Sequence, residues 1–482
     1  MTASSLPVAE APRASAFPSL QTLAVTGFVL LTLAGFAGAG GGVFAPAWAV
    51  AAAATAVTLV WRNPAGYLAF VVSLWFYTPL LRRVLDLHHG FNPTNLALAA
   101  PVLASAVAVI TLLRFLKELR GVLFAPALLV IAAVTYGFLV GALRNGLVAA
   151  FYAYLTWLSP AMVGLHVALH WRRYPDVRQA FLRTLAWGIG PAAAYGVFQF
   201  VTMPPWDAFW MVSTDLQSIG RPEPFSVRVF GSMTMPGTFA VVMEVGLLLL
   251  LSADVRGRLA SLVLGFIGLL LSRIRTAWLG FALGLVLQLV TQPVRRLPRN
   301  WLTLTFVAVM ALPVITIPRI REGITSRIVS IASGETDSSV RSRVMVARAA
   351  YTLVLDYAEG AGLGATGSAV TARRSGGIRN FENGLLEVFF LFGWPGGLLF
   401  FLGVAGIVVQ GIRLADAQFD PFANAARSGA LALLASLLIS EIFTGAPGTL
   451  FWVLIGFGVS AHAHNLASGA TAAYRAQQLR WR

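Results

Sequence analysis

Long apolar runs recur along almost the whole chain, and they constrain its fold more than any other feature. A helix needs about 20 mostly apolar residues to cross the hydrocarbon layer of a membrane. About fourteen stretches approach this criterion, near residues 20–38, 44–61, 65–81, 93–113, 122–143, 147–170, 180–202, 233–252, 259–272, 276–291, 301–317, 384–411, 428–445 and 448–466. The sequence therefore predicts an all-α, polytopic integral membrane protein with about 12–14 transmembrane helices.

The composition excludes a water-soluble fold. Of the 482 residues 57% are hydrophobic and only 11% are charged, whereas soluble domains carry roughly 25% charged residues. Cysteine is absent, which excludes disulfides, thiolate nucleophiles and cysteine-based metal sites. The first apolar run lacks the cleavage site of a signal peptide, and we interpret it as a retained first span.

The charged residues are few and mostly basic. The net charge of +16 arises from 35 Lys and Arg against 19 Asp and Glu, and Lys117 is the only lysine. By the positive-inside rule, the short basic turns at 114–120, 171–179, 254–258 and 293–300 are cytoplasmic, as are both termini. The remaining arginines face outward. Because arginine presents a planar fork that matches phosphate oxygens, we expect an anion site on the outer face.

The distribution of hydrophilic residues divides the chain into four parts. A cytoplasmic tail covers 1–18, transmembrane helices with short loops cover 19–318, and a large outer loop with an amphipathic helix covers 319–383. C-terminal transmembrane helices and a short cytoplasmic tail cover 384–482. The outer loop contains a GxGxxG string starting at Gly362, but the string follows a helix rather than a strand. It therefore predicts a loop hinge or a turn of close backbone approach instead of a dinucleotide site.

Three arginines stand beside or between apolar runs on the predicted outer side. Arg273 and Arg275 lie in SRIRTAWLGF, with apolar helix before and after them. Charge in such a position is costly, so a functional role is the default hypothesis. Arg228 directly precedes the run that begins near residue 233, and an interface anchor is the alternative interpretation for it.

Glu382 and Asn383 stand where the outer loop meets the run at 384–411. A carboxylate at a helix N-terminus is stabilised there by about 0.3–1 kcal/mol, which makes a capping role one interpretation. The other is a general base that accepts a proton from an attacking hydroxyl. The two roles are compatible, because a helix start can hold a carboxylate in place for chemistry.

Three of these segments, in this order, resemble the bacterial O-antigen ligase and O-antigen or exopolysaccharide polymerase superfamily. The first is RVFGSMTMPGTFA, which contains Arg228, and the second is SRIRTAWLGF, in which Arg275 is followed by Thr, Ala and Trp. The third is the outer loop with its Ser/Arg-rich segment DSSVRSRVMVARAA and its glycine-rich turn. It leads to a segment similar to the family's His-Asn-x-Tyr-Leu. The likeness covers residues 195–410.

The resemblance implies a GT-C-like glycosyltransferase that moves glycan from an undecaprenyl-diphosphate carrier to an acceptor at the periplasmic face of the bacterial inner membrane. Arg228, Arg275, Arg273 and Arg341 would bind the donor diphosphate and stabilise the charge that develops on it. Glu382, which stands in place of the ligase histidine, would activate the acceptor hydroxyl, and Asn383 would position it. The carboxylate favours the polymerase branch, in which the protein joins lipid-linked repeat units into a surface polysaccharide.

This interpretation requires no metal and no other cofactor, since arginine supplies the positive charge. The expected partners are the lipid-linked donor, the glycan acceptor and membrane lipid. A chain-length regulator is a further candidate partner. Nucleic acid is not expected, because the basic residues are split between the two faces. The alternatives are an O-antigen ligase acting on lipid A core, a flippase for lipid-linked oligosaccharide, and a structural membrane subunit.

Overall fold

The chain is all-α in its computed structural model. The structure describes residues 19–214, 219–292, 297–318, 320–322, 325, 348, 351–366, 383–413, 415–438 and 440–471. The protein is about 82% helical, and in the described part its only extended pairing is an antiparallel bridge between Gly220 and Val227. Seven described helices are long and apolar enough to cross a membrane, and five shorter apolar helices accompany them. The predicted fold class, an all-α polytopic membrane protein, is confirmed.

The helices of the first half follow the predicted apolar runs, but two are longer: the helix at 64–89 extends past the run at 65–81, and the helix at 174–202 begins before the run at 180–202. Asn63 separates the helix at 64–89 from the one before it: its Oδ1 accepts the N–H of Gly66 at 2.8 Å, while Pro64 occupies the first helical position. Such a cap and an N-terminal proline both favour a helix start. The helices are α1 (Leu20–Phe36), α2 (Gly41–Arg62), α3 (Pro64–His89), α4 (Ala100–Ala106), α5 (Val109–Arg114), α6 (Leu116–Leu119), α7 (Ala125–Arg144), α8 (Leu147–Leu169) and α9 (Tyr174–Thr202), with 3-10 turns η1 (Leu96–Ala99), η2 (Val122–Phe124) and η3 (Trp171–Arg173).

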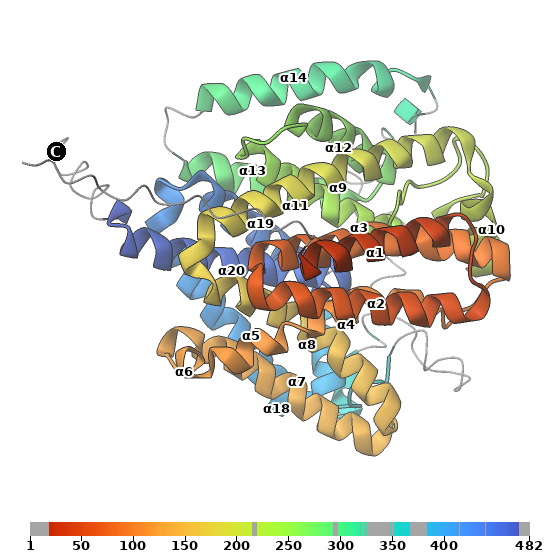
Figure 1. Ribbon diagram of the computed structural model, residues 1–482. Coiled ribbons are helices and arrows are strands. Elements are labelled where there is room, and N and C mark those ends of the chain that lie inside the picture. Colours follow the sequence, from red (N-terminus) through yellow and green to blue (C-terminus); the bar gives the residue numbers. More distant parts are fainter. Residues whose placement is uncertain are drawn as a thin grey trace, which may run out of the picture.

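The second half continues the bundle. Its helices are α10 (Pro205–Thr214), α11 (Pro236–Leu251), α12 (Arg258–Ser272), α13 (Arg275–Thr291), α14 (Leu297–Ile315), α18 (Gly384–Arg413), α19 (Pro421–Ala435) and α20 (Gly445–Ala467), with 3-10 turns η6 (Ala415–Gln418) and η7 (Ser436–Leu438). Figure 1 shows α14 at the edge of the bundle, above α12 and α13.

Small residues allow the central helices to approach closely. Gly164 of α8 faces the backbone of Trp452 in α20, and Gly456 of α20 faces the carbonyl of Gly164. A Cβ at either glycine would collide with the facing backbone. Packing through small residues is the usual basis of helix association in membranes, where no water is left to expel.

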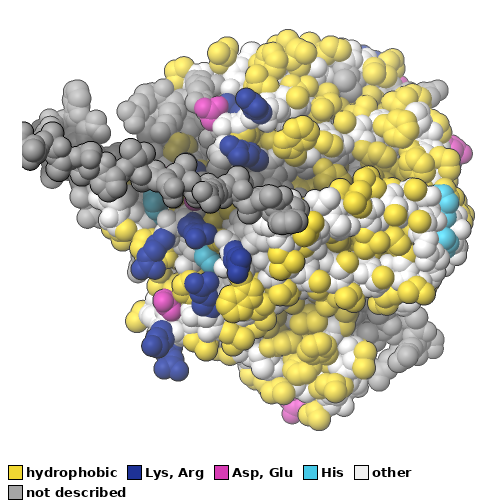
Figure 2. Space-filling model, in the orientation of Figure 1, with side chains coloured by type: hydrophobic (Ala, Val, Ile, Leu, Met, Phe, Trp, Pro, Cys, Tyr) yellow, Lys and Arg dark blue, Asp and Glu magenta, His cyan; other side chains and the backbone are white. Residues whose placement is uncertain are grey.

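The bundle has two chemically different ends. His166, in the last turn of α8, contacts the Pro64 carbonyl at the start of α3 at 3.3 Å, so α3 and α8 run antiparallel. The C-terminal end of α3 therefore lies on the same side as the N-terminal end of α8. We call this side, which also includes the C-terminal ends of α9 and α12, the site end; it lies to the right in Figure 1. The opposite side, where Figure 2 shows Lys and Arg side chains gathered beside a broad hydrophobic surface, is the basic end.

Two predicted runs differ from the structure. The run at 428–445 is not one helix, because α19 ends at Ala435 and the chain turns at 440–444 before α20. The Glu441 carboxylate stabilises this turn by accepting the N–H groups of Phe443 and Thr444 at 3.0 and 2.6 Å. The run at 93–113 is divided into η1, α4 and α5, which together form the candidate span Leu96–Arg114.

Candidate functional site

The chain reverses sharply between α12 and α13, and two of the predicted arginines lie in this turn. Arg273 follows the last residue of α12 in the left-handed conformation, with φ 55° and ψ 30°. Ile274 is extended, and Arg275 is the first residue of α13. Both arginine side chains are half-buried. Since a residue with a Cβ is disfavoured in the left-handed region by about 1–2 kcal/mol, the surrounding contacts must stabilise this turn.

Ser272 and Trp278, which flank the two arginines in the sequence motif, provide those contacts. The Ser272 hydroxyl donates to the Leu269 carbonyl at 2.6 Å and accepts the N–H of Ile274 at 3.3 Å. The Trp278 indole N–H donates to the same Leu269 carbonyl at 2.9 Å. The spacing of Ser272 and Trp278 in the motif thus has a local structural cause, because both side chains close the turn that presents the arginines.

Arg228 is brought to this turn by a short extended segment. The N–H of Arg228 donates to the Ile219 carbonyl at 2.8 Å, and the next N–H, that of Val229, donates to the Leu271 carbonyl at 3.3 Å. Leu271 is two residues before Arg273, so the backbone of Arg228 lies beside the end of α12. The structure therefore brings together three predicted residues, Arg228, Arg273 and Arg275.

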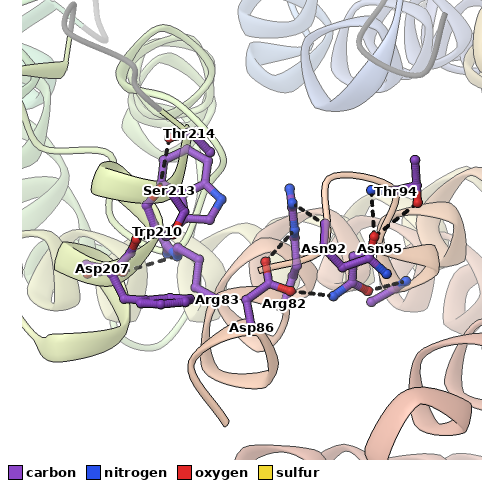
Figure 3. A network of polar contacts seen from close by, with 12 residues as sticks. Arg82, Arg83, Asp86, Asn92, Thr94, Asn95, Asp207, Trp210, Ser213 and Thr214 are labelled. Carbon is purple, nitrogen blue, oxygen red and sulfur yellow. Dashed lines mark hydrogen bonds and ion pairs between the residues drawn. The ribbon is translucent and has the colours of Figure 1, made fainter. Parts of the chain in front are cut away.

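A buried ion pair supports this region from α3. Arg83 is 1% exposed and its Nε lies 3.1 Å from Oδ1 of Asp207 in α10, which is fully buried. The second Asp207 oxygen accepts from Tyr195 and Gln199 of α9 at 2.7 and 2.6 Å. Figure 3 shows the pair joining two separate parts of the chain, with Arg82 and Asp86 on the other side of α3.

Gln199 extends this network to the segment that carries Arg228. Its Oε1 accepts the N–H groups of Phe230 and Gly231 at 3.1 Å each, and Arg83 Nη2 donates to the Gly231 carbonyl at 2.6 Å. The charge of Arg83 is therefore balanced by Asp207 within the protein, and its role is to hold the segment in place. Arg83 and Asp207 are far apart in the sequence. The only sequence signal for this pair was a charged residue, Arg83, next to the apolar run at 65–81.

The start of α13 carries positive charge where a helix already has a positive end. The N-terminus of a helix presents free N–H groups and a partial positive charge, which favour acidic side chains. No acidic residue occupies the first turn of α13, and Arg275 stands there instead. Together with Arg273 and Arg228, this arrangement suits an anion such as a phosphate group.

A pair of carboxyl groups that was not among the predicted site residues, Glu387 and Glu441, lies at the start of α18. Glu387, in the first turn of α18, is 9% exposed, and Thr366 donates to its Oε1 at 3.4 Å. Glu441 is close enough for its charge to act on Glu387. Burial raises the pKa of the Glu441 carboxyl, although the hydrogen bonds from Thr444 and Phe443 act in the opposite direction. A carboxylate inside the apolar run at 384–411 was the signal that could have identified Glu387.

Asn383 has a local role at the same helix start. Its Oδ1 accepts the N–H of Leu386 at 3.1 Å, which makes Asn383 a cap of α18. Gly384 packs against the turn that holds Glu441, where a Cβ would lie 2.8 Å from the Ser440 carbonyl oxygen. The predicted base Glu382 and the predicted phosphate ligand Arg341 lie outside the described residues.

The glycine-rich turn is a site of close backbone approach, as predicted. Gly362 and Gly364 have φ values of 81° and 87°, and a Cβ on Gly362 would collide with the backbone of Gly141 in α7. The N–H of Leu363 donates to the Gly137 carbonyl at 2.9 Å, and that of Gly362 to the Leu391 carbonyl at 3.0 Å. The turn therefore lies between α7 and α18, and it leads to Thr366 beside Glu387.

These features define a class of protein: a multi-pass, all-α membrane protein with arginines and carboxyl groups collected at one end of the bundle. Among the described residues, no group of three or more His, Asp or Glu side chains is arranged to hold a metal ion. Residues 260–401 match the family model described as O-antigen ligase. The match supports the O-antigen ligase and polymerase superfamily and confirms the predicted resemblance. No curated protein matches the chain.

The matched region covers the arginine turn between α12 and α13 and the start of α18 with Asn383 and Glu387. Arg228 and Glu441 lie outside it. O-antigen ligase or polymerase-type glycan transfer by a membrane glycosyltransferase is the activity that this family supports.

Proposed function

We propose that the protein polymerises undecaprenyl-diphosphate-linked oligosaccharide repeat units into a surface polysaccharide at the periplasmic face of the bacterial inner membrane. The observation that carries this proposal is the turn between α12 and α13, which presents Arg273 and Arg275 beside the backbone of Arg228. Three arginines close to the N-terminus of α13 suit a diphosphate better than a neutral sugar.

In the proposed reaction, a hydroxyl oxygen of the acceptor sugar attacks the anomeric carbon of the donor. A new C–O bond forms, the bond between that carbon and the diphosphate oxygen breaks, and undecaprenyl diphosphate leaves with the bonding electrons. Arg228, Arg273 and Arg275, with Arg341, stabilise the negative charge on the leaving group. Glu382 takes the proton of the attacking hydroxyl, and Asn383 holds the start of α18 through its cap.

The decisive experiment uses the purified protein in lipid nanodiscs with an undecaprenyl-diphosphate-linked oligosaccharide. We expect glycan lengthening by wild type and a loss of at least about a hundredfold in Arg275→Ala, the scale seen when one transition-state donor is removed. Arg120→Ala is the matched control, because Arg120 is exposed and lies at the basic end. Unchanged lengthening by Arg275→Ala would exclude this residue from the donor site. Translocation of the carrier without new glycosidic bonds would indicate a flippase.

A ligase is the second candidate, because the matched family model is described as O-antigen ligase. The same assay separates the two functions when lipid A core is added as acceptor. Lengthening of carrier-linked glycan supports the polymerase, whereas transfer to lipid A core without lengthening supports the ligase.

A further inference from the structure

A cavity of about 400 Å³ opens at the basic end, away from the candidate functional site. Four arginines line it together with one histidine: Arg62, Arg114, Arg172, Arg173 and His170. They come from the α2–α3 turn, the end of α5 and the α8–α9 turn. Figure 2 shows Lys and Arg side chains collected over this end of the molecule.

The fully buried His166 holds these three elements together. Its Nε2 donates to the Pro64 carbonyl at 3.3 Å, two residues after Arg62. In the neutral imidazole, its Nδ1 accepts the hydroxyl of Thr111 at 2.8 Å, one helical turn before Arg114. The carbonyl of His166 accepts Nδ1–H of His170 at 2.8 Å, just before Arg172 and Arg173. The backbone positions of the cationic side chains are thus fixed by one buried group.

Aromatic rings and the backbone further position the charged groups. The Arg114 guanidinium lies 5.6 Å from the centre of the Phe115 ring, and that ring meets His170 edge-on at 5.4 Å. Arg173 Nη1 donates to the Arg62 carbonyl at 3.5 Å. Burial lowers the pKa of His170, and the hydrogen bond to the His166 carbonyl acts in the opposite direction. The positive charges of Arg114 and Arg173 lower this pKa further.

None of these four arginines, Arg62, Arg114, Arg172 and Arg173, forms an ion pair with a carboxylate among the described residues. No acidic residue of the described part of the chain lines the cavity. The positive-inside rule requires basic residues on the cytoplasmic side of the membrane, but it does not require them to lie close together. Convergence of four like charges around one cavity instead favours a bound anion.

The surroundings of the cavity favour an anion attached to lipid. Trp61 is 56% exposed, and Leu169 and Phe115 provide further apolar surface beside the arginines. The cavity lies at the ends of candidate membrane-spanning helices, where lipid headgroups are expected. Basic pockets between transmembrane helices on the cytoplasmic side are suited to anionic headgroups.

We propose that this cavity binds the phosphate of an anionic phospholipid, with Arg62, Arg114, Arg172 and Arg173 as ligands and Trp61 against the adjoining glycerol and acyl region. The site lies at the opposite end of α8 from the glycine-rich turn, about 35 Å away for a helix of 23 residues. It is independent of the donor site in the proposed function.

The proposal is tested by native mass spectrometry of the protein purified in a zwitterionic detergent. Dioleoyl phosphatidylglycerol and dioleoyl phosphatidylcholine are titrated separately, and inorganic phosphate is added as a third probe. The test variant is the double substitution Arg172→Gln, Arg173→Gln. The control is Lys117→Gln, Arg120→Gln, which removes the same charge from α6 on the same face but outside the cavity.

We expect wild type and the control to retain phosphatidylglycerol in preference to phosphatidylcholine, and the test variant to bind phosphatidylglycerol at least about tenfold more weakly. If both double variants bind phosphatidylglycerol equally weakly, the loss of net charge alone explains the result, and the proposal is overturned. Phosphate binding without a preference between the two lipids would also overturn it, since the cavity would then take the free anion. Size-exclusion profiles establish that each variant is folded.

Discussion

Arg273 adopts a backbone conformation that its own side chain does not favour, in a turn closed by Ser272 and Trp278. Residues held in the left-handed region persist only where neighbours over-determine them, and such positions cluster at functional sites. A glycine would adopt this conformation without strain. The backbone conformation does not account for arginine here, so we look to its guanidinium, which lies 5.9 Å from the centre of the Phe200 ring.

Two substitutions separate strain from function at this residue. We expect Arg273→Gly to be about 1 kcal/mol more stable than Arg273→Ala, because alanine keeps the left-handed strain and glycine does not. Both should lower glycan transfer by at least about tenfold, because both lose the guanidinium. Thermal unfolding in detergent and the nanodisc transfer assay measure the two effects. Equal stability of the variants would show that the turn is not strained, and full transfer would place Arg273 outside the donor site.

The Glu441 carboxyl gives a pH-dependent prediction. Burial raises its pKa above the ordinary value of 4.5 in the folded protein. A raised folded pKa means that its contribution to stability is present below pH 4.5 and is lost as the pH rises toward the folded value. Glu441→Gln cannot ionise and keeps an oxygen for the N–H groups of Phe443 and Thr444. Its stability relative to wild type should therefore be higher at pH 8 than at pH 4.5, as measured by thermal unfolding; a constant difference would contradict the prediction.

At the scale of elements, the glycine-rich turn connects α7, α18 and the carboxyl pair. We expect Gly362→Ala to destabilise the protein by at least about 2 kcal/mol, through the positive φ and the collision with Gly141. Gly458→Ala is the control, because Gly458 lies within α20 with nothing within 4 Å of an added Cβ. That control should be neutral or stabilising by about 0.5–1 kcal/mol. If both variants lose a similar amount of stability, close backbone approach does not explain why the turn contains Gly362.

Most helices could be predicted from the sequence, because an apolar run long enough to span a membrane has few alternatives to a helix. The runs at 147–170 and 384–411 begin and end within two residues of α8 and α18. The failures arise where a polar side chain changes the local backbone. Glu441 holds a turn in the middle of the run at 428–445, and its effect depends on which backbone groups its carboxylate reaches.

The candidate site was only partly accessible to sequence reasoning. Arg228, Arg273 and Arg275 could be selected because charge beside apolar helix is unusual. The Arg83–Asp207 pair and the proximity of Glu387 to Glu441 depend on contacts between distant helices, which a single sequence does not contain.

At the scale of the whole molecule, the basic residues that the structure describes gather at opposite ends of the bundle. One group surrounds the cavity at the basic end, and the other includes the arginine turn at the site end. The absence of cysteine makes this arrangement directly testable, because any introduced cysteine is the only thiol.

Single cysteines at exposed positions 223 and 120 report the two ends. We expect a membrane-impermeant maleimide added to intact spheroplasts to label Glu223→Cys and not Arg120→Cys, because the positive-inside rule places the basic end in the cytoplasm. After lysis both should react, which controls for accessibility. The reverse pattern in intact spheroplasts would invert the assigned topology.

The helices around the arginine turn are short. α11, α12 and α13 contain 16, 15 and 17 residues, or about 24, 22 and 26 Å at 1.5 Å per residue, against a hydrocarbon core of about 30 Å. Helices shorter than the hydrocarbon core are accommodated by local thinning of the bilayer, so we expect a thinner membrane around α11, α12 and α13. In the proposed function, a polyprenyl carrier would then bring its diphosphate to the guanidinium groups while its tail stays in lipid, and the thickness of the surrounding membrane would become a determinant of donor capture.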